Sequence, residues 1–307
     1  MMRDDQMEMV SRKQARGVKS GKIPFSKLVG NGNDFIIVDG RSGLIADNQQ
    51  CFTRRVCERR RSVGADGVLV IEDSQTADFR LRIINADGSE ADMCGNGARC
   101  AAVYARRKRI APAVMTMETG AGTIEALVDG AYATIKMTSV GRPQPPVILS
   151  LEEQGSVKAY AVDSGVPHAV VFTCGVSEES VFRCPLKDVP ASAVHAMGRA
   201  IRRHPRWGED GSNADFVDII NSRSIYVRTW ERGVEGETPA CGTGAVASAF
   251  VARERGHVTG DTVTVHMPGG PLKVVFREGG KSGLEAWLAG DVAWSFDGSI
   301  YRQEERE

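Results

Sequence analysis

Two cysteines stand in the same short glycine-rich motif at widely separated places in the chain. The motif reads Cys94-Gly-Asn-Gly-Ala98 at its first occurrence and Cys241-Gly-Thr-Gly-Ala245 at its second. A thiolate can take a proton and a thiol can give one, so two such groups on opposite faces of a carbon atom could invert its configuration. A reaction that needs two thiols therefore fits this sequence better than one that needs a single nucleophile.

The repetition extends beyond the motif. At an offset of 147 residues, segments 94–106 and 241–253 are identical at seven of thirteen positions. Alanines recur at i, i+4 and i+7 in both segments, a spacing that predicts a helix with one small-residue face that packs closely. Two like halves imply two like lobes, each with a cysteine at the N-terminus of its central helix. The alanines are Ala98, Ala102 and Ala105 in the first segment and Ala245, Ala249 and Ala252 in the second.

A helix N-terminus suits both the thiol and an anionic substrate. Its unpaired amides and its dipole stabilise negative charge, which lowers a cysteine pKa toward a usable thiolate. The Gly-x-Gly that follows each cysteine lets backbone amides approach a carboxylate without obstruction by a Cβ atom. The alternative is a pair of buried structural cysteines beside turn glycines. Redox or metal roles lack support, because the sequence has no Cys-x-x-Cys and no zinc-like spacing among its seven cysteines.

Further motifs along the chain match one family. With these motifs, the sequence from about Phe25 to Ile300 resembles diaminopimelate epimerase, a cofactor-independent enzyme of lysine and peptidoglycan precursor synthesis. The matching segments are Phe25-Ser-Lys-Leu-Val-Gly-Asn-Gly-Asn-Asp-Phe35, Asn85-Ala-Asp-Gly-Ser-Glu90, Met93-Cys-Gly-Asn-Gly-Ala-Arg-Cys100, Pro167-His168, Trp230-Glu-Arg-Gly233, Glu237-Thr-Pro-Ala-Cys-Gly-Thr-Gly244 and Pro268-Gly-Gly270.

The resemblance implies a role for each matching residue. Cys94 and Cys241 would be the acid–base pair, and backbone amides would cradle the α-carboxylate of the substrate. Arginine, carboxylate and amide side chains would hold the far amino-acid end, which suits a zwitterion. His168 and Glu231 would tune the thiols, since a nearby cation favours a thiolate and a carboxylate opposes it. The cradle residues are Gly95, Asn96, Gly242 and Thr243, and the gripping residues are Asn33, Asn85, Asn213, Glu231 and Arg232.

Each of these side chains also has a purely structural interpretation. The asparagines could shape turns in glycine-rich stretches. Adjacent Glu231 and Arg232 could be a solvated pair, and His168 could be a structural histidine.

Two departures from the family pattern bear on the substrate. Val166 stands before Pro167-His168 where the family commonly has asparagine, and Gly64-Ala-Asp-Gly67 lacks a common glutamine. Both positions concern the far end of the substrate and leave the thiols untouched.

Composition and sequence motifs limit which partners, cellular location and cofactors we expect for this protein. The chain has 307 residues with 39 basic and 39 acidic side chains, so its zero formal charge favours neither nucleic acid nor an anionic membrane as a partner. No apolar run approaches the roughly 18 residues of a membrane span. A thiol catalyst needs a reducing compartment, which predicts a cytoplasmic location. No dinucleotide or phosphate-loop fingerprint and no metal-ligand spacing is present, so we expect neither cofactor nor metal.

The pattern of strands and helices predicts an α+β fold. We expect two homologous lobes from the duplication, each a mainly antiparallel sheet wrapped around a central helix, with the active site in the cleft between them. Residues 1–22 are polar and predict a disordered tail. We expect an N-terminal lobe over 23–142 and a C-terminal lobe over 143–290, joined at the proline-rich segment Gly141–Pro146. A helix over Asn48–Arg61 would carry the arginine-rich run 54–61 on a solvated face.

The family resemblance also implies that the last strand, 291–303, returns to the first lobe, where Phe296 matches a position used in a homodimer contact. The leading hypothesis is epimerisation of LL-diaminopimelate to meso-diaminopimelate by the thiol pair formed by Cys94 and Cys241. One alternative is a pyridoxal-phosphate-independent racemase of the same fold that acts on another amino acid. A second alternative, from a different class, is a non-catalytic amino-acid-binding protein.

Overall fold

The computed structural model describes residues 21–43, 49–137, 140–174, 181–182, 184–279 and 283–301. The predicted tail over 1–22 lies outside these residues, apart from its last two positions. The first half of the chain forms the elements β1 (Lys22–Gly30), β2 (Asn33–Asp39), η1 (Gly40–Ser42), α2 (Gln49–Cys57), β3 (Gly67–Glu72), β4 (Phe79–Asn85), β5 (Glu90–Ala91), α3 (Gly95–Arg107), β6 (Val114–Thr119), β7 (Gly122–Asp129) and β8 (Tyr132–Lys136).

The second half repeats this order. Its elements are β9 (Val147–Leu151), β10 (Gly155–Asp163), β11 (Pro167–Cys174), η2 (Leu186–Asp188), α4 (Ala191–Arg202), η3 (Pro205–Trp207), β12 (Asn213–Asn221), β13 (Ser224–Glu231), β14 (Gly236–Thr238), α5 (Gly242–Glu254), β15 (Thr262–Met267), β16 (Gly270–Gly279) and β17 (Gly283–Tyr301). Residues 140–146, which include the predicted linker, have no regular secondary structure.

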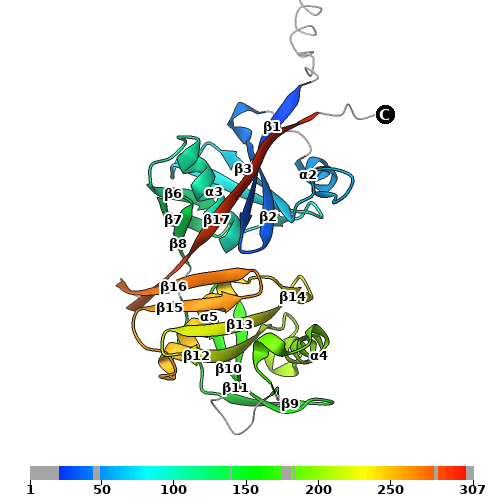
Figure 1. Cartoon of the computed structure of the whole chain (residues 1–307), viewed down its shortest axis with the longest axis vertical. Helices are drawn as coiled ribbons and strands as arrows, with labels where there is room; N and C mark the ends of the chain where they lie inside the picture. The colour runs from blue at the N-terminus through cyan, green and yellow to red at the C-terminus, as the bar shows by residue number, and fades with distance from the viewer. Residues whose placement is uncertain are drawn as a thin grey trace, which may run out of the picture.

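The two halves share one topology, and this confirms the predicted α+β fold with two similar, mainly antiparallel lobes. In the first half β2 pairs with β3 and β4 with β6 in parallel. In the second half the parallel pairs are β11 with β12 and β13 with β15. The other pairings among the described strands are antiparallel. Figure 1 shows the halves as an upper and a lower lobe, with α3 inside one and α5 inside the other.

Strand β17 belongs to both lobes. Its first part pairs with β16 of the lower lobe and with β8 of the upper lobe, with Leu288 opposite both Val274 and Ile135. Its second part continues into the upper lobe and pairs with β1, as Figure 1 shows by the long strand that runs obliquely between the lobes. The upper sheet therefore closes around α3 in the order β1, β2, β3, β4, β6, β7, β8, β17. The predicted return of the last strand is observed.

Helix α2 is shorter than the sequence suggests. The helix predicted over Asn48–Arg61 ends at Cys57. Beyond it, Arg60 has a left-handed φ of 71°, which a continuing helix does not permit. Arg59 instead pairs with Asp34 at 2.5 Å and with Asp66 at 2.8 Å. The arginines of this run are exposed as predicted, apart from the half-buried Arg55, but they do not form one helix face, because residues 59–61 lie beyond the end of α2.

The core is continuous across both central helices. The predicted alanine faces of α3 and α5 are fully buried, and large aliphatic side chains of the surrounding strands pack against them. Small residues let a helix lie close inside a curved sheet, so the alanine stripes explain how each lobe encloses its helix. Burial of this apolar surface is the main source of stability for each lobe. The six alanines are Ala98, Ala102, Ala105, Ala245, Ala249 and Ala252.

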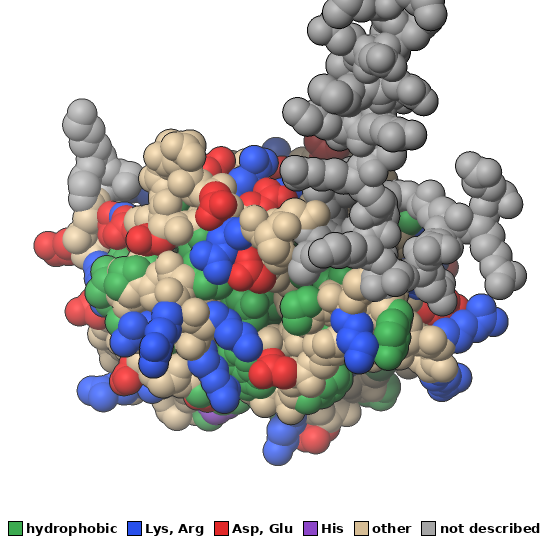
Figure 2. Space-filling model, turned by 90° about the horizontal axis from the view of Figure 1, so that it is seen from above, with side chains coloured by type: hydrophobic (Ala, Val, Ile, Leu, Met, Phe, Trp, Pro, Cys, Tyr) green, Lys and Arg blue, Asp and Glu red, His purple; other side chains and the backbone are tan. Residues whose placement is uncertain are grey.

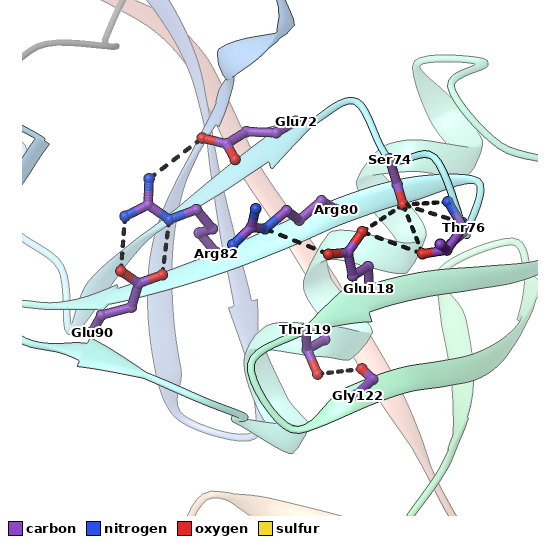
Figure 3. Close-up of polar contacts among 10 residues, drawn as sticks. Glu72, Ser74, Thr76, Arg80, Arg82, Glu90, Glu118, Thr119 and Gly122 are labelled. Carbon is purple, nitrogen blue, oxygen red and sulfur yellow. Dashed lines mark hydrogen bonds and ion pairs between the residues drawn. The ribbon is translucent and has the colours of Figure 1, made fainter.

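Charges of both signs are mixed on the surface. Figure 2 shows basic and acidic side chains interspersed on the face seen from above, in keeping with the zero formal charge. Polar contacts tie the outer strands of the upper lobe together (Figure 3). Arg82 on β4 bonds both oxygens of Glu90, at 2.8 and 2.7 Å. Glu118 on β6 accepts from Ser74 at 2.6 Å and fixes the turn before β4.

Candidate active site

The two motif cysteines cap the two central helices. Cys94 is the N-cap of α3 and Cys241 is the N-cap of α5, both with extended backbone. The Cys94 sulfur accepts from the Gly97 amide at 3.5 Å, so it replaces one of the missing partners of the first turn. The Cys241 sulfur lies 3.4 Å from the Thr243 hydroxyl. Cys94 is half-buried, whereas Cys241 is only 4% exposed.

The two helix ends meet. A Cβ atom built on Gly95 would lie 4.0 Å from the Gly242 Cα, and one built on Gly242 would lie 3.9 Å from the Gly95 Cα. The same added atoms would lie 3.2 and 2.9 Å from a methyl group of Leu288 on β17. The added atoms would thus be in ordinary van der Waals contact with the opposite backbone, and only the Leu288 methyl group would have to move. The free N-terminal amides of both helices are consequently gathered in one small region beside the two thiols.

Burial dominates the acidity of both thiols. It raises the pKa of Cys94, an effect that the Gly97 amide opposes and that Glu231 reinforces. It also raises the pKa of Cys241 well above the ordinary value, again with Glu231 reinforcing the shift. The helix ends do lower both pKa values, but by less than burial raises them. The predicted lowering by the helix N-terminus is therefore present, but burial outweighs it and leaves both thiol pKa values raised.

A buried polar cluster lies behind Cys241. His168 Nδ1 is 2.6 Å from Asp215 Oδ2, and both side chains are completely buried. Asp215 also accepts from the Thr229 hydroxyl at 2.7 Å. A Cβ atom on Gly244 would lie 2.5 Å from an Asp215 oxygen, so this carboxylate sits against the first turn of α5. Glycine there lets the carboxylate approach the free amides of the helix end, where negative charge is stabilised.

Glu231 links this cluster to both cysteines. It accepts from the Thr238 hydroxyl at 2.9 Å. Burial raises its pKa, and the Thr238 bond, His168 and the Cys241 thiol oppose that rise. Its charge in turn raises the pKa of both Cys94 and Cys241. The carboxylate thus acts on both thiols, which is the arrangement required of a residue that tunes them.

Amides gather on the Cys94 side. Asn96 is 3% exposed and donates to Asn33 Oδ1 at 2.5 Å and to the Ala240 carbonyl at 3.3 Å. Asn33 donates in turn to Asp66 at 3.1 Å. The structure therefore joins Asn33 and Asn96 directly, and it ties the start of α3 to the residue before Cys241.

The other predicted gripping residues are placed less uniformly. The Asn213 amide donates to the Pro167 carbonyl at 3.1 Å, and its oxygen accepts from the Arg232 backbone at 2.7 Å. Asn85 is exposed, and its amide donates to Ser89 within its own turn at 3.0 Å. Val166 is half-buried beside His168, next to Pro167. Asn213 thus positions Arg232, while Asn85 keeps its side chain on a surface turn.

Four residues at the site were not selected from the sequence. Asp215 lies two positions after Asn213 on the same strand face, a period-2 spacing that could have revealed it. Asp66 stands inside a motif noted only for its departure from the family. Leu288 and Arg99 carried no chemical signal, because an aliphatic residue in a strand and an arginine in a helix are ordinary. Only the three-dimensional contacts assign them to the site.

The described residues contain no group of three or more His, Cys, Asp and Glu side chains that could hold a metal ion. In the same ranges no helix is long and apolar enough to span a membrane. Cys94, Cys100 and Cys241 are free thiols.

Comparisons with known proteins identify the family of the chain. A family model described as diaminopimelate epimerase matches residues 25–142 and 160–294. The chain is 38% identical to the diaminopimelate epimerase of Hydrogenobaculum sp. over 285 residues, covering 90% of this chain and 97% of the relative. It is 37% identical to that of Archaeoglobus fulgidus, with 93% and 99% covered.

Solved structures show the same fold at lower identity. A probable proline racemase from Agrobacterium radiobacter superposes with a TM-score of 0.68 at 17% identity, and the match covers 92% of this chain and 93% of that one. Because two thiol-bearing helix ends meet in a duplicated fold, and because the family model spans most of the sequence, the chain belongs to the diaminopimelate epimerase family.

Proposed function

We propose that this protein converts LL-diaminopimelate to meso-diaminopimelate without a cofactor, using Cys94 and Cys241 as the acid–base pair. The observation that carries the proposal is the meeting of the two cysteine-capped helix ends at Gly95 and Gly242. Relatives of nearly the same length are diaminopimelate epimerases, which supports the substrate.

The proposed mechanism follows from this geometry. The substrate carboxylate binds the free amides of Gly95-Asn96 and Gly242-Thr243, which brings the α-carbon between the thiols. One cysteine, as thiolate, takes the α-proton, and the other cysteine, as thiol, delivers its proton to the opposite face. Net charge is conserved, and the two sulfurs exchange protonation states. Inversion follows because removal and delivery occur on opposite sides of the carbon.

The raised pKa values of the thiols fit this chemistry. An α-proton is weakly acidic, so a stronger base removes it faster, and a thiolate with a raised pKa is the stronger base. The thiolate then forms only in small amounts at neutral pH. We therefore expect kcat/KM to rise with pH on the alkaline side of neutrality.

The far end of the substrate is assigned to the groups near Asn213. Arg232, held through its backbone by Asn213, would pair with the distal carboxylate, and amides would complete that site. The side chain of Val166 cannot form a hydrogen bond, whereas the family commonly has a side-chain amide at this position. This difference favours a second candidate function, in which the same mechanism acts on a single-centred amino acid.

Solvent isotope exchange tests the proposal. The protein would be incubated in deuterium oxide with LL-diaminopimelate, lysine or histidine, and deuterium at the α-carbon would be measured by mass spectrometry. We expect rapid incorporation with inversion for LL-diaminopimelate and little for the other two. Faster exchange of lysine or histidine would overturn the substrate but keep the thiol chemistry. No exchange with any of them would support a binding protein instead.

The family resemblance further supports a homodimer. It also supports a cytoplasmic location, where reducing conditions keep the thiols free. Phe296 on β17 is 49% exposed and stacks edge-on against Phe25 at 5.9 Å, so an apolar surface is available beside the outer strand. Sedimentation of the wild type and of Phe296→Ser measures the oligomeric state. A wild type that sediments as a monomer would contradict the homodimer.

A further inference from the structure

Arg99 is a buried cation that neither the family resemblance nor the mechanism above assigns. It lies on α3 five residues after Cys94, and its side chain is 0% exposed. Its Nη2 donates to Asn31 Oδ1 at 2.6 Å and to Asn96 Oδ1 at 2.8 Å. Its Nε and Nη1 have no hydrogen-bond partner among the described residues. A buried charge that is only partly bonded is costly, so it calls for an explanation.

No carboxylate of the described residues balances this charge. The titratable groups that face the guanidinium are Cys94 and Cys100 on its own helix and Tyr132 on β8. Burial lowers the pKa of Arg99, but an arginine in a protein keeps its proton. The described part of the chain therefore buries a positive charge near a thiol and provides no carboxylate as its counter-ion.

The fold itself does not need this arginine. At the offset of the repeat, the residue of α5 that corresponds to Arg99 is Val246, which is equally buried. A helix enclosed by the same topology is thus packed in the second lobe by an apolar residue. Replacing valine by a partly bonded guanidinium would destabilise a core unless the charge served another purpose.

The contacts of Arg99 lead to both parts of the candidate site. Through Asn96 it reaches Asn33 and the Ala240 carbonyl, which is adjacent to Cys241. Through Asn31 it reaches the second lobe, because the Asn31 amide donates to the Pro271 carbonyl at 3.0 Å. Since Asn96 Oδ1 accepts from Arg99, the Asn96 amide group is forced to donate toward Asn33 and Ala240. The arginine therefore fixes the orientation of a residue in the carboxylate cradle.

We propose that Arg99 is a positioning residue whose fixed positive charge stabilises the thiolate of Cys94 at the N-terminus of α3. The proposal rests on the proposed function. Among the described residues no carboxylate offsets this charge, so the Cys94 thiolate is the anion on which it acts. The charge then favours the anion through a medium of low polarity, where electrostatic attraction is strong.

Two variants separate the charge from the hydrogen bonds. Arg99→Gln keeps amide donors but removes the charge, and Arg99→Lys keeps the charge but loses the planar fork. Val246→Leu is the matched control, because it alters the corresponding buried position of α5 without changing charge. Thermal unfolding of all variants reports whether each is folded. If Arg99→Gln fails to fold, Arg99→Met replaces it.

The readout is alkylation by iodoacetamide across a pH series, without substrate, with each cysteine followed by peptide mass spectrometry. Glu231 opposes thiolate formation at both cysteines, and Arg99 favours it at Cys94. We expect the midpoint for Cys94 in Arg99→Gln to move to higher pH, with the Cys241 midpoint unchanged. Arg99→Lys should keep the Cys94 midpoint near that of the wild type.

Turnover gives the second readout. We expect kcat/KM for LL-diaminopimelate to fall roughly 10²-fold in Arg99→Gln and less in Arg99→Lys, with Val246→Leu near the wild type. An unchanged Cys94 midpoint in folded Arg99→Gln, or an equal shift in Arg99→Lys, would overturn the proposal. Because alkylation needs no turnover, it decides the role of Arg99 even if isotope exchange overturns the proposed substrate.

Discussion

The first turns of α3 and α5 have the same structure, but different charged groups surround them. Behind Gly97 of α3 lie apolar side chains, with Leu69 3.2 Å and Phe35 3.6 Å from an added Cβ atom. Behind Gly244 of α5 lies the Asp215 carboxylate. Farther along, α3 buries a cation where α5 buries Val246. Both repeats thus keep a thiol at a helix end, but α3 itself carries a buried positive charge, whereas strand β12 places the Asp215 carboxylate beside α5.

This difference suits a site whose two thiols must be in opposite protonation states. Identical surroundings would give both thiols the same tendency to lose a proton. Different surroundings separate their behaviour, as is common for acid–base pairs in enzymes. The comparison can be tested by changing matched positions in the two lobes.

The largest expected effect follows removal of either thiol. Cys94→Ala and Cys241→Ala should each lower net epimerisation by roughly 10⁴-fold, because each turnover needs one thiolate and one thiol. Cys100→Ala is the control, since Cys100 is buried on the same helix and takes no part in the mechanism. Conversion of LL-diaminopimelate to the meso form, followed by chiral chromatography, measures the loss. Near-normal turnover in one cysteine variant would mean that the lobes do not share the reaction.

The next largest effect concerns the two residues assigned to the far end of the substrate, Arg232 in the second lobe and Asn85 in the first. Arg232→Leu should cost about 2–5 kcal/mol of transition-state binding, because a substrate carboxylate is left unpaired. Asn85→Ala should cost no more than about 1 kcal/mol, because Asn85 is exposed and bonded within its own turn. The values of kcat/KM for LL-diaminopimelate give both energies. Equal losses would show that the far end is held from both sides.

We expect alanine substitutions in the first turns of α3 and α5 to change the free energy of unfolding by different amounts. Gly244→Ala places a methyl group 2.5 Å from Asp215 and 2.9 Å from Thr229, which are held in a buried network, so it should destabilise by about 1–3 kcal/mol. Gly97→Ala meets a flexible leucine methyl at 3.2 Å and should change stability by less than about 1 kcal/mol. Urea unfolding measures both. A Gly97 variant as unstable as the Gly244 variant would mean that the apolar setting is equally tight.

The variant Glu231→Gln tests how the negative charge of Glu231 changes the pKa of the two thiols. The Glu231 charge raises the pKa of Cys241, so its removal should lower that pKa and move alkylation of Cys241 to lower pH. Cys94 should shift in the same direction, because Glu231 also raises its pKa. Alkylation rates against pH with peptide mapping give both midpoints. A midpoint for Cys241 that moves upward would reverse the assigned sign.

The smallest effect concerns Val166. Val166→Asn restores an amide near Pro167 and His168, and it should lower KM for diaminopimelate by up to about tenfold through one charge-assisted hydrogen bond. Steady-state kinetics with diaminopimelate and lysine, for the wild type and the variant, measure the change. If the wild type prefers lysine, the far-end assignment fails while the thiol pair keeps its role.

Local patterns were reliable where short-range rules decide the outcome. The glycine after each cysteine and the alanine spacing predicted two capped helices, and both begin directly after Cys94 and Cys241. The prediction failed at the end of α2, where helix propensity does not include the pull of Asp34 and Asp66 on Arg59.

The sequence by itself determined the duplication, the two thiols and their places at helix ends, because these depend on residue type and spacing within a few turns. Tertiary structure decided the acidity of those thiols, since burial and the charge of Glu231 come from other strands and outweigh the helix end. It alone placed Asp215 against the first turn of α5 and buried the Arg99 side chain of α3. Such charges act through space, and sequence distance carries no record of which groups will share a buried environment.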